Sequence, residues 1–509
     1  MDDTELVPGA WRSLWALVLG FFMILVDSTI VSVAIPAIMT HYRADVGLVI
    51  WVSSSYLLGY AVPLLITGRL GDRFGPKRMY LIGLSVFTLA SLWCGLSPTI
   101  GVLIAARAVQ GLGASMMSPQ TMAVITRTFP PQRRGAAMGL WGSTAGVATL
   151  VGPILGGVLV DSLGWETIFY VNVPVGIVAY WMAWRNVPKL ETHTHQFDWL
   201  GVALSGVGMF CIVFGLQEGE TYDWGTISGP VTVWGVIAAG VVVFAAFIWW
   251  QARNKREPLV PLGLFSNRNF GNSNLGVMVM GAIATAMSFP MMLYLQTARG
   301  LTPTQAAVLM APTAIASLVL APVVGRWIDA HDPRPLVIGG FALVGASLAA
   351  YALVTNPQID VLWYLAPSLL LGVAATGVWG PLSVSATRTL GPAFAGAGAG
   401  VYNASRQLGA VIGSAATAAL IENRISAHLP GAVASGHGSG SLPAALRAPY
   451  SAAQAESLWL PAAIAVLGVI SGLLLQRRPG RGDFGSDPSI SPEAKPRATL
   501  TSQITEAAP

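Results

Sequence analysis

The acidic residue Asp27 lies near the middle of a long apolar stretch, a position that no other carboxylate in this sequence shares. The remaining acids fall in polar segments or, like Asp161 and Glu422, at the ends of apolar stretches. The histidines also fall in polar segments, at positions 41, 193, 195, 331, 428 and 437. A carboxylate in the middle of a membrane-spanning segment is costly and is typical of groups that bind and release protons. We interpret Asp27 as such a group; the alternative is an aspartate that only hydrogen-bonds neighbouring helices.

Arg107 is a second charge inside an apolar stretch. If both stretches cross a membrane as helices, Asp27 lies about 12 Å from the outer face of a ~30 Å hydrocarbon core, and Arg107 lies about 13 Å from it. These depths allow an ion pair or a water-linked pair. A nearby cation favours the ionised carboxylate and apolar surroundings favour the protonated form, and a reversible proton carrier needs both influences. Alternatively, Arg107 only bonds backbone carbonyls.

The composition around these charges is that of an all-α membrane protein. Hydrophobic residues make up 54% of the 509 residues, charged residues make up 10%, and the mean hydropathy is +0.62. A soluble domain would carry about 25% charged residues. The two cysteines, Cys94 and Cys211, lie in different apolar stretches, so we expect neither a disulfide nor a metal site. Fourteen stretches have spanning length, at about 14–38, 48–67, 79–97, 99–124, 135–160, 166–187, 199–217, 229–250, 270–296, 304–328, 335–354, 361–387, 395–422 and 457–476.

The distribution of Lys and Arg predicts the orientation of these spans. With the N-terminus inside, 22 of the 28 cations fall in inner segments, four in outer segments and two within spans. Cytoplasmic segments of membrane proteins carry this excess, so both termini are expected in the cytoplasm. A twelve-span count would break the alternation. The acidic segment 1–10 lacks the basic region of a cleaved signal peptide, so the first stretch is expected to be retained as a span.

The charged segment 68–78 joins two predicted spans and is expected to form a tight aqueous turn. It resembles the signature of the major facilitator superfamily, G-x-x-x-D-R-x-G-R-[KR], with Pro76 in place of an arginine. The matching residues are Gly68, Asp72, Arg73, Gly75, Lys77 and Arg78. We expect Asp72 and the cations Arg73, Lys77 and Arg78 to control a conformational switch, with Asp72 accepting hydrogen bonds from a neighbouring helix N-terminus. A positively charged topology anchor is the alternative reading.

Four further motifs resemble those of the fourteen-span drug:proton antiporters within this superfamily. Residues 25–36 resemble L-D-x-T-[IV]-V-N-V-A-L-P around Asp27, with Ser32 replacing asparagine, and residues 107–113 resemble R-x-x-Q-G-x-G. The fifth span carries the glycine-rich hinge motif of exporters, at Gly146, Gly152, Pro153, Gly156 and Gly157, although a helix-packing face explains these glycines nearly as well. The thirteenth span carries N-x-x-R-Q-x-G. These motifs supply candidate polar residues of a central cavity: Gln110, Asn403, Arg406 and Gln407. Arg406 could bond neighbouring groups or meet an anionic substrate.

A short internal repeat predicts the domain organisation. Residues 325–329 repeat the G-R-x-x-D of residues 68–72 at the end of the tenth span. Facilitators consist of two six-helix halves with related loops. We therefore expect a major facilitator fold with two six-helix halves, at 1–190 and 261–478, and an inserted helix pair at 191–260. A disordered cytoplasmic tail is expected at 479–509.

The resemblance implies a proton-coupled antiporter that exports amphiphilic small molecules, such as drugs or antibiotics, across a bacterial cytoplasmic membrane. Export of one endogenous metabolite, lipid or siderophore is the alternative. An enzyme is not expected, because the sequence lacks H-E-x-x-H, a G-x-G-x-x-G after a strand, and paired carboxylates on one span. No cofactor and no nucleic-acid partner are expected, since the cations follow the membrane topology. The expected partners are protons, substrate and membrane lipid, and the chain is expected to be a monomer.

Overall fold

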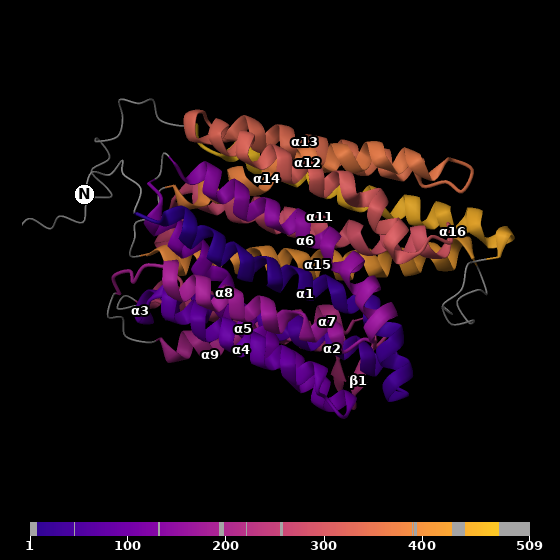
Figure 1. Cartoon of the computed structure of the whole chain (residues 1–509), viewed down its shortest axis with the longest axis horizontal. Coiled ribbons are helices and arrows are strands. Elements are labelled where there is room, and N and C mark those ends of the chain that lie inside the picture. The colour runs from indigo at the N-terminus through magenta and orange to yellow at the C-terminus, as the bar shows by residue number, and fades with distance from the viewer. Residues whose placement is uncertain are drawn as a thin grey trace, which may run out of the picture. The chain divides into compact units, whose positions relative to one another are not determined.

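The computed structural model describes residues 8–44, 46–130, 133–192, 198–219, 221–254, 258–388, 390, 394–429 and 443–477, which form a bundle of long helices (Figure 1). The first helices are α1 (Ala10–Tyr42), α2 (Val46–Ala61), α3 (Leu64–Phe74), α4 (Pro76–Gly95), α5 (Ile100–Thr128), α6 (Arg134–Leu163), α7 (Thr167–Tyr170) and α8 (Asn172–Asn186). A pair follows, α9 (Trp199–Gln217) and α10 (Val233–Arg253). The last helices are α11 (Arg268–Thr297), α12 (Pro303–Ala330), α13 (Arg334–Val354), α14 (Leu365–Thr387), α15 (Ala395–His428), α16 (Ala444–Ser457) and α17 (Trp459–Leu474).

Local sequence explains where these helices begin and end. Thr302 and Gln305 form a reciprocal capping box at the start of α12, which satisfies backbone groups that a helix end leaves unpaired. Gly75 separates α3 from α4 with a φ of 93°, a conformation that glycine adopts without steric penalty, and Pro76 follows at the first position of α4. Large apolar side chains on the helix surfaces are exposed, among them Leu353 at 70%, as expected of helices that face hydrocarbon.

The helices before α9 and those after α10 meet along two lines of contact. On one, α6 packs against α12 and α14; on the other, α3 and α5 pack against α15. Gly68 of α3 lies directly against Gly396 and Gly400 of α15, and a Cβ at Gly68 would collide with that backbone. Helices that are distant in sequence therefore lie side by side at the centre of the bundle (Figure 1).

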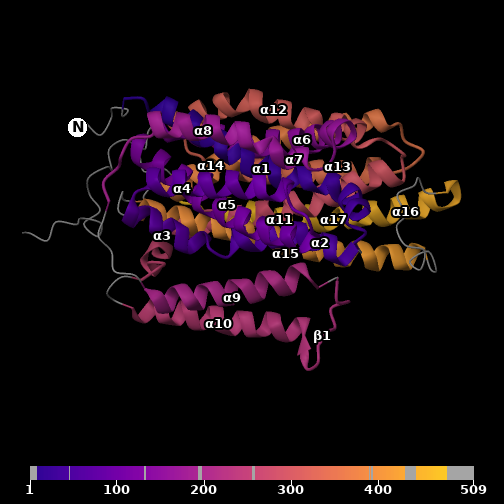
Figure 2. The same ribbon diagram turned by 60° about the horizontal axis from the view of Figure 1, so that its bottom comes forward.

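Helices α9 and α10 pack mainly against each other and lie along one edge of the bundle (Figure 2). Apolar side chains form part of their contact with the rest: Met209 and Val213 of α9 cluster with Leu58 of α2 and Val411 of α15. Of the candidate spans, α10 has the smallest buried share. A short antiparallel hairpin, β1 (Thr226–Ser228) and β2 (Val231–Thr232), joins the two helices. Sequence analysis did not predict this hairpin.

Within the described residues, 11 helices are long and apolar enough to cross a membrane. The other three predicted spans, at 48–67, 135–160 and 395–422, coincide with α2 and α3, with α6 and with α15. The count of fourteen spans stays a prediction. Two expectations were wrong. Segment 68–78 was expected to be a tight turn, but it is helical on both sides of Gly75. Segment 423–457, between the last two predicted spans, was expected to be a loop, but part of it is helical, in the last turns of α15 and in α16.

Candidate functional site

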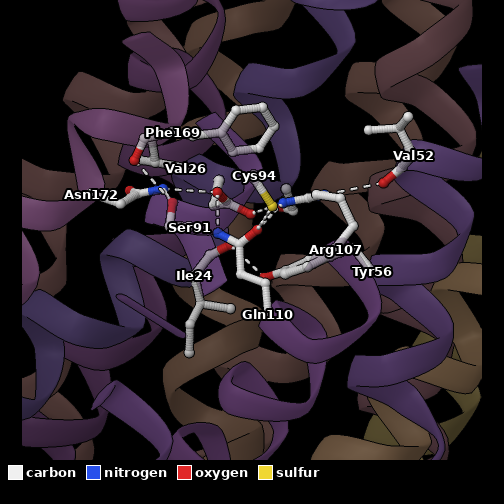
Figure 3. Close-up of polar contacts among 12 residues, drawn as sticks. Ile24, Val26, Val52, Tyr56, Ser91, Cys94, Arg107, Gln110, Phe169 and Asn172 are labelled. Atoms are coloured by element: carbon white, nitrogen blue, oxygen red, sulfur yellow. Dashed lines mark hydrogen bonds and ion pairs between the residues drawn. The ribbon is translucent and has the colours of Figure 1, made fainter. Parts of the chain in front are cut away.

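Asp27 of α1 is completely buried, and three side chains from other helices hold its carboxylate. Figure 3 shows these three side chains, Arg107, Gln110 and Asn172. Arg107 of α5 approaches Oδ2 through Nη1 at 2.6 Å. Gln110 of α5 and Asn172 of α8 donate to Oδ1 at 2.8 and 2.9 Å. The ion pair that the depths of Asp27 and Arg107 allowed is therefore present, and each carboxylate oxygen has a hydrogen-bond donor.

Arg107 has partners besides Asp27. Its Nε donates to the carbonyl of Val52 at 3.1 Å, and its Nη1 donates to Oε1 of Gln110 at 2.6 Å. The guanidinium lies 4.1 Å from the ring centroid of Tyr56, which gives a cation–π contact. These contacts give the arginine acceptors other than the Asp27 carboxylate.

Close helix packing produces this geometry. A Cβ at Gly111 would collide with the carbonyl of Tyr56, so only glycine lets α5 approach α2 this closely. The approach brings Val52 and Tyr56 of α2 onto Arg107. Around the polar cluster lies an apolar shell that includes Val26 and Leu103, which excludes bulk water and strengthens the interactions within it.

Sequence analysis did not identify Asn172 as part of this site. It lies 3% exposed at the first position of α8, directly after the break that separates α7 from α8. Its side chain also donates to Oγ of Ser91 at 3.0 Å, and Ser91 donates to the carbonyl of Phe169. An asparagine inside an apolar stretch was the available signal, but its distance from Asp27 in sequence concealed the contact.

Asp72 of the signature segment is buried against the N-terminus of α15. Its two oxygens accept from the amides of Gly396 and Ala397, each at 2.9 Å, and Oδ1 accepts from Arg127 at 2.6 Å. Burial raises the pKa of Asp72, against the opposing influence of Arg127 and of the two amides. The predicted contact with a helix N-terminus is present, and it joins α3 to α15.

The other signature residues make separate contacts along α3 and α4. Gly68 packs on α15, and Gly75 supplies the break before α4. Lys77 donates to the carbonyl of Trp184 at 2.6 Å, which ties α4 to α8. Arg73 stacks over Phe74, at 5.3 Å from the ring centroid, and Arg78 is exposed. The structure thus brings Gly68 to Asp72 but does not bring the three cations to a common site.

Asp329, in the repeated segment 325–329, makes a contact that corresponds to the one between Asp72 and α15. Its Oδ1 accepts from the amide of Gly135 at the start of α6, at 2.7 Å. The adjacent Arg134 donates to the carbonyls of Phe129, Thr126 and Thr387, and the last of these lies in α14. Burial lowers the pKa of Arg134 to about 10. Two contacts between an acid and a helix N-terminus therefore join the halves. From the sequence, the repeat predicted only the domain organisation.

The glycines of the predicted hinge motif lie in α6 and pack against α1. A Cβ at Gly152 would collide with Thr29, and one at Gly156 would lie 2.8 Å from Ile30. A Cβ at Gly157 would lie 3.6 Å from Oγ1 of Thr304 in α12, an ordinary van der Waals distance. Pro153 lies inside the helix. The surroundings of Gly146 lie outside the described residues. The glycines close to Asp27 in space are therefore packing positions in this conformation.

The candidate cavity residues fall into two groups. Gln110 belongs to the Asp27 cluster, as described above. On α15, Arg406 donates to the Tyr60 hydroxyl at 2.9 Å, and Asn403 accepts from Ser118 at 3.0 Å. Gln407 is buried. Since Tyr60 in turn donates to Ser118 at 3.0 Å, a continuous chain of hydrogen bonds crosses between α15, α2 and α5.

Glu218, which the sequence places in a polar segment after the seventh predicted span, is buried. It follows the last residue of α9 and has no exposed surface. Burial raises the pKa of Glu218 more than the neighbouring hydroxyls of Ser54 and Thr221 lower it. Two histidines also differ from expectation, since His41 and His428 lie in the last turns of α1 and α15 rather than in loops. Histidines 193, 195 and 437 and the side chain of Glu422 lie outside the described residues.

Known proteins share this sequence pattern and this architecture. The Major Facilitator Superfamily matches residues 17–414 and 275–495. The chain belongs to the major facilitator superfamily. It is 50% identical over 472 residues to the uncharacterized MFS-type transporter Rv1250 of Mycobacterium tuberculosis H37Rv, covering 91% of this chain and 81% of that relative.

Two relatives in this superfamily are named as export proteins. The tetracenomycin C resistance and export protein of Streptomyces glaucescens is 32% identical, over 82% of this chain and 77% of the relative. The multidrug export protein EmrB of Escherichia coli K12 is 31% identical, over 81% and 80%. Among solved structures, the proton:xylose symporter XylE matches with a TM-score of 0.63 at 14% identity, over 91% of this chain and 94% of XylE, which shows the shared fold.

Proposed function

We propose that this chain is a proton-coupled antiporter that exports amphiphilic small molecules from the cytoplasm. The observation that carries the proposal is the buried Asp27–Arg107 pair, held in an apolar shell where a carboxylate can exchange a proton. The resistance and export proteins among its relatives support the direction of transport and the class of substrate.

Protonation of Asp27 from the outside neutralises its carboxylate and weakens the ion pair. Arg107 retains Gln110 Oε1 and the Val52 carbonyl as acceptors, so its guanidinium stays in place. The bundle then favours the inward-facing arrangement. There, a substrate in the central region displaces the proton to the cytoplasm, either by charge pairing or by competition for space. The proton released inside is the one taken up outside, so the protonation state of Asp27 returns to its starting point after each cycle.

The contacts of Asp72 and Asp329 act as latches between the halves. Both carboxylates lie against helix N-termini, where the helix dipole and free amide groups favour a negative charge. Opening of the cytoplasmic side would require both contacts to break. We assign Gly68 to this mechanism as the close-packing position that lets Asp72 reach α15, and the glycines of α6 as positions where α6 can slide on α1.

The same proposal covers the organisation of the chain. The edge position of α9 and α10 supports an inserted pair at 191–260, peripheral to the transport path, between six-helix halves at 1–190 and 261–478. The distribution of cations supports cytoplasmic termini in a bacterial inner membrane. The tail at 479–509 lies outside the described residues.

The topology can be tested with single cysteines at positions 4, 220 and 500. They should react with an impermeant maleimide from the inside, the outside and the inside, respectively. Labelling of position 220 only from the inside contradicts this topology.

Purified protein in proteoliposomes tests the function itself. A panel of cationic, zwitterionic, neutral and anionic amphiphiles would be offered under an imposed pH gradient, with a pH-sensitive dye inside the vesicles. We expect uphill movement of several panel members, each accompanied by proton flow in the opposite direction. Movement of a single compound would favour the alternative, export of one metabolite, lipid or siderophore. Uphill transport without proton flow would contradict the antiport.

A further inference from the structure

A second buried polar cluster lies where α15 meets α1, α2 and α6. Arg406 of α15 spans this interface, with Nη2 bonded to Tyr60 and Cζ 6.0 Å from the ring centroid of Phe21. Phe21 stacks on Trp141 at 5.0 Å between ring centroids, and Trp141 lies 6.4 Å from Tyr402. One cation is thus surrounded by aromatic rings that come from both halves of the chain.

This cluster contains hydrogen-bond donors that lack acceptors. Among the described residues, Nε of Arg406, Nε1 of Trp141 and the hydroxyl of Tyr402 are buried and have no hydrogen-bond partner. Trp141 and Tyr402 are 2% and 0% exposed. Buried donors without acceptors are costly, and such groups are satisfied in the state for which the site is built. Three unsatisfied donors in one place call for an acceptor from outside the chain.

The charge of the cluster decides which acceptor fits. Within the described part of the chain no carboxylate forms an ion pair with Arg406, and Asp27 is committed to Arg107, Gln110 and Asn172. A cationic substrate would meet a positive charge here and no compensating acid. An anionic oxygen group would supply an acceptor of the kind that these donors lack, and an aromatic ring beside it would pack against the aromatic side chains of the cluster.

We infer that the Arg406 cluster is the substrate subsite of this antiporter and that it selects aromatic compounds with an acidic oxygen group. The inference rests on the proposed function and names its substrate class.

The negative charge of the substrate has an energetic consequence. Exchange of one proton for one monovalent anion moves two charges in the same electrical direction, whereas exchange for a monovalent cation moves none. Both the pH gradient and the membrane potential therefore drive export of an anion.

Binding to the purified full-length chain tests the subsite directly. The probes are 2-naphthalenesulfonate, a permanent anion, and (2-naphthylmethyl)trimethylammonium, a permanent cation of similar shape, measured by isothermal titration calorimetry. We expect the wild-type chain to bind the sulfonate about tenfold or more tightly than the cation, and Arg406→Gln to weaken sulfonate binding by about 10- to 100-fold. Arg406→Lys, which keeps the charge, should restore part of the loss.

Tyr60→Phe separates recognition from a structural role. It removes the hydroxyl that Arg406 bonds but leaves the cation, so sulfonate binding should change by less than about threefold. Arg299→Gln, at a cation that bonds the carbonyls of Asn356 and Pro357, serves as the matched control. The inference is wrong if the wild-type chain prefers the cation or binds neither probe, if Arg406→Gln binds the sulfonate unchanged, or if Tyr60→Phe loses as much binding as Arg406→Gln.

Transport in proteoliposomes keeps this outcome separate from that of the proposed function. With one proton exchanged, a clamped potential of ~60 mV should change the steady-state sulfonate gradient about 100-fold and leave the gradient of the cationic probe unchanged. Sulfonate binding that depends on Arg406, without proton flow during transport, would contradict proton antiport and leave the subsite intact. Proton-coupled export of the cationic probe alone would contradict the subsite and leave antiport intact.

Discussion

Asp27→Asn is expected to abolish uphill, pH-driven efflux while the protein still moves substrate down its gradient. Asparagine can occupy the same space and accept through its oxygen, but it cannot take up and release a proton. One proton crossing ~150 mV supplies about 3.5 kcal/mol, which sustains a gradient of a few hundred-fold for a neutral solute. In proteoliposomes with an imposed pH gradient, this ratio should fall to about one in the variant.

Stability must be separated from coupling in this experiment. Asp27→Asn leaves Arg107 as a buried cation without its counter-charge, and breaking a buried ion pair costs about 3–5 kcal/mol. The double variant Asp27→Asn with Arg107→Gln removes both charges, so it should regain thermal stability without regaining coupling. Asp161→Asn, at an exposed acid near the end of α6, is the matched control and should behave as the wild-type chain. Substrate concentration by the stable double variant in response to pH would place the coupling group elsewhere.

Asp72→Asn is expected to release the cytoplasmic latch and slow transport, with equilibrium substrate binding nearly unchanged. The substitution removes the charge that accepts two amides at the start of α15 and pairs with Arg127. Hydrogen bonds to a charged group contribute about 1.5–3 kcal/mol each, so the closed cytoplasmic side should lose about ten- to a hundred-fold in population. The accessibility of a cysteine at the buried position Ala397 from the cytoplasmic side and the initial rate of efflux would measure both effects.

Two further variants bracket this result. Asp329→Asn should act in the same direction, because Asp329 also accepts from an amide at the start of a helix, that of Gly135. Glu191→Gln removes an exposed acid whose backbone carbonyl, not its side chain, accepts from Arg127, and should have no effect. Normal transport by Asp72→Asn, or a loss mainly of substrate affinity, would contradict a latch.

The Asp27–Arg107 pair could be anticipated from the sequence because depth in a membrane helix is a local property. Each residue advances ~1.5 Å along the axis, so counting from the ends of two apolar stretches placed both charges at one level. The superfamily and the character of the spans followed in the same way from signature spacing and hydropathy. None of these inferences required knowledge of which helices are neighbours.

Only the tertiary structure decided which partners complete each site. Asn172 is 145 residues from Asp27, and nothing local shows that the break between α7 and α8 aims its amide at that carboxylate. The amides that hold Asp72 belong to α15, whose start is more than 300 residues away. Glu218 is near a polar turn in the sequence and yet is buried against α2. The rotation of each helix about its own axis and its choice of neighbours arise from side-chain packing over the whole bundle, so a linear pattern fixes the depth of a residue but not the face that it meets.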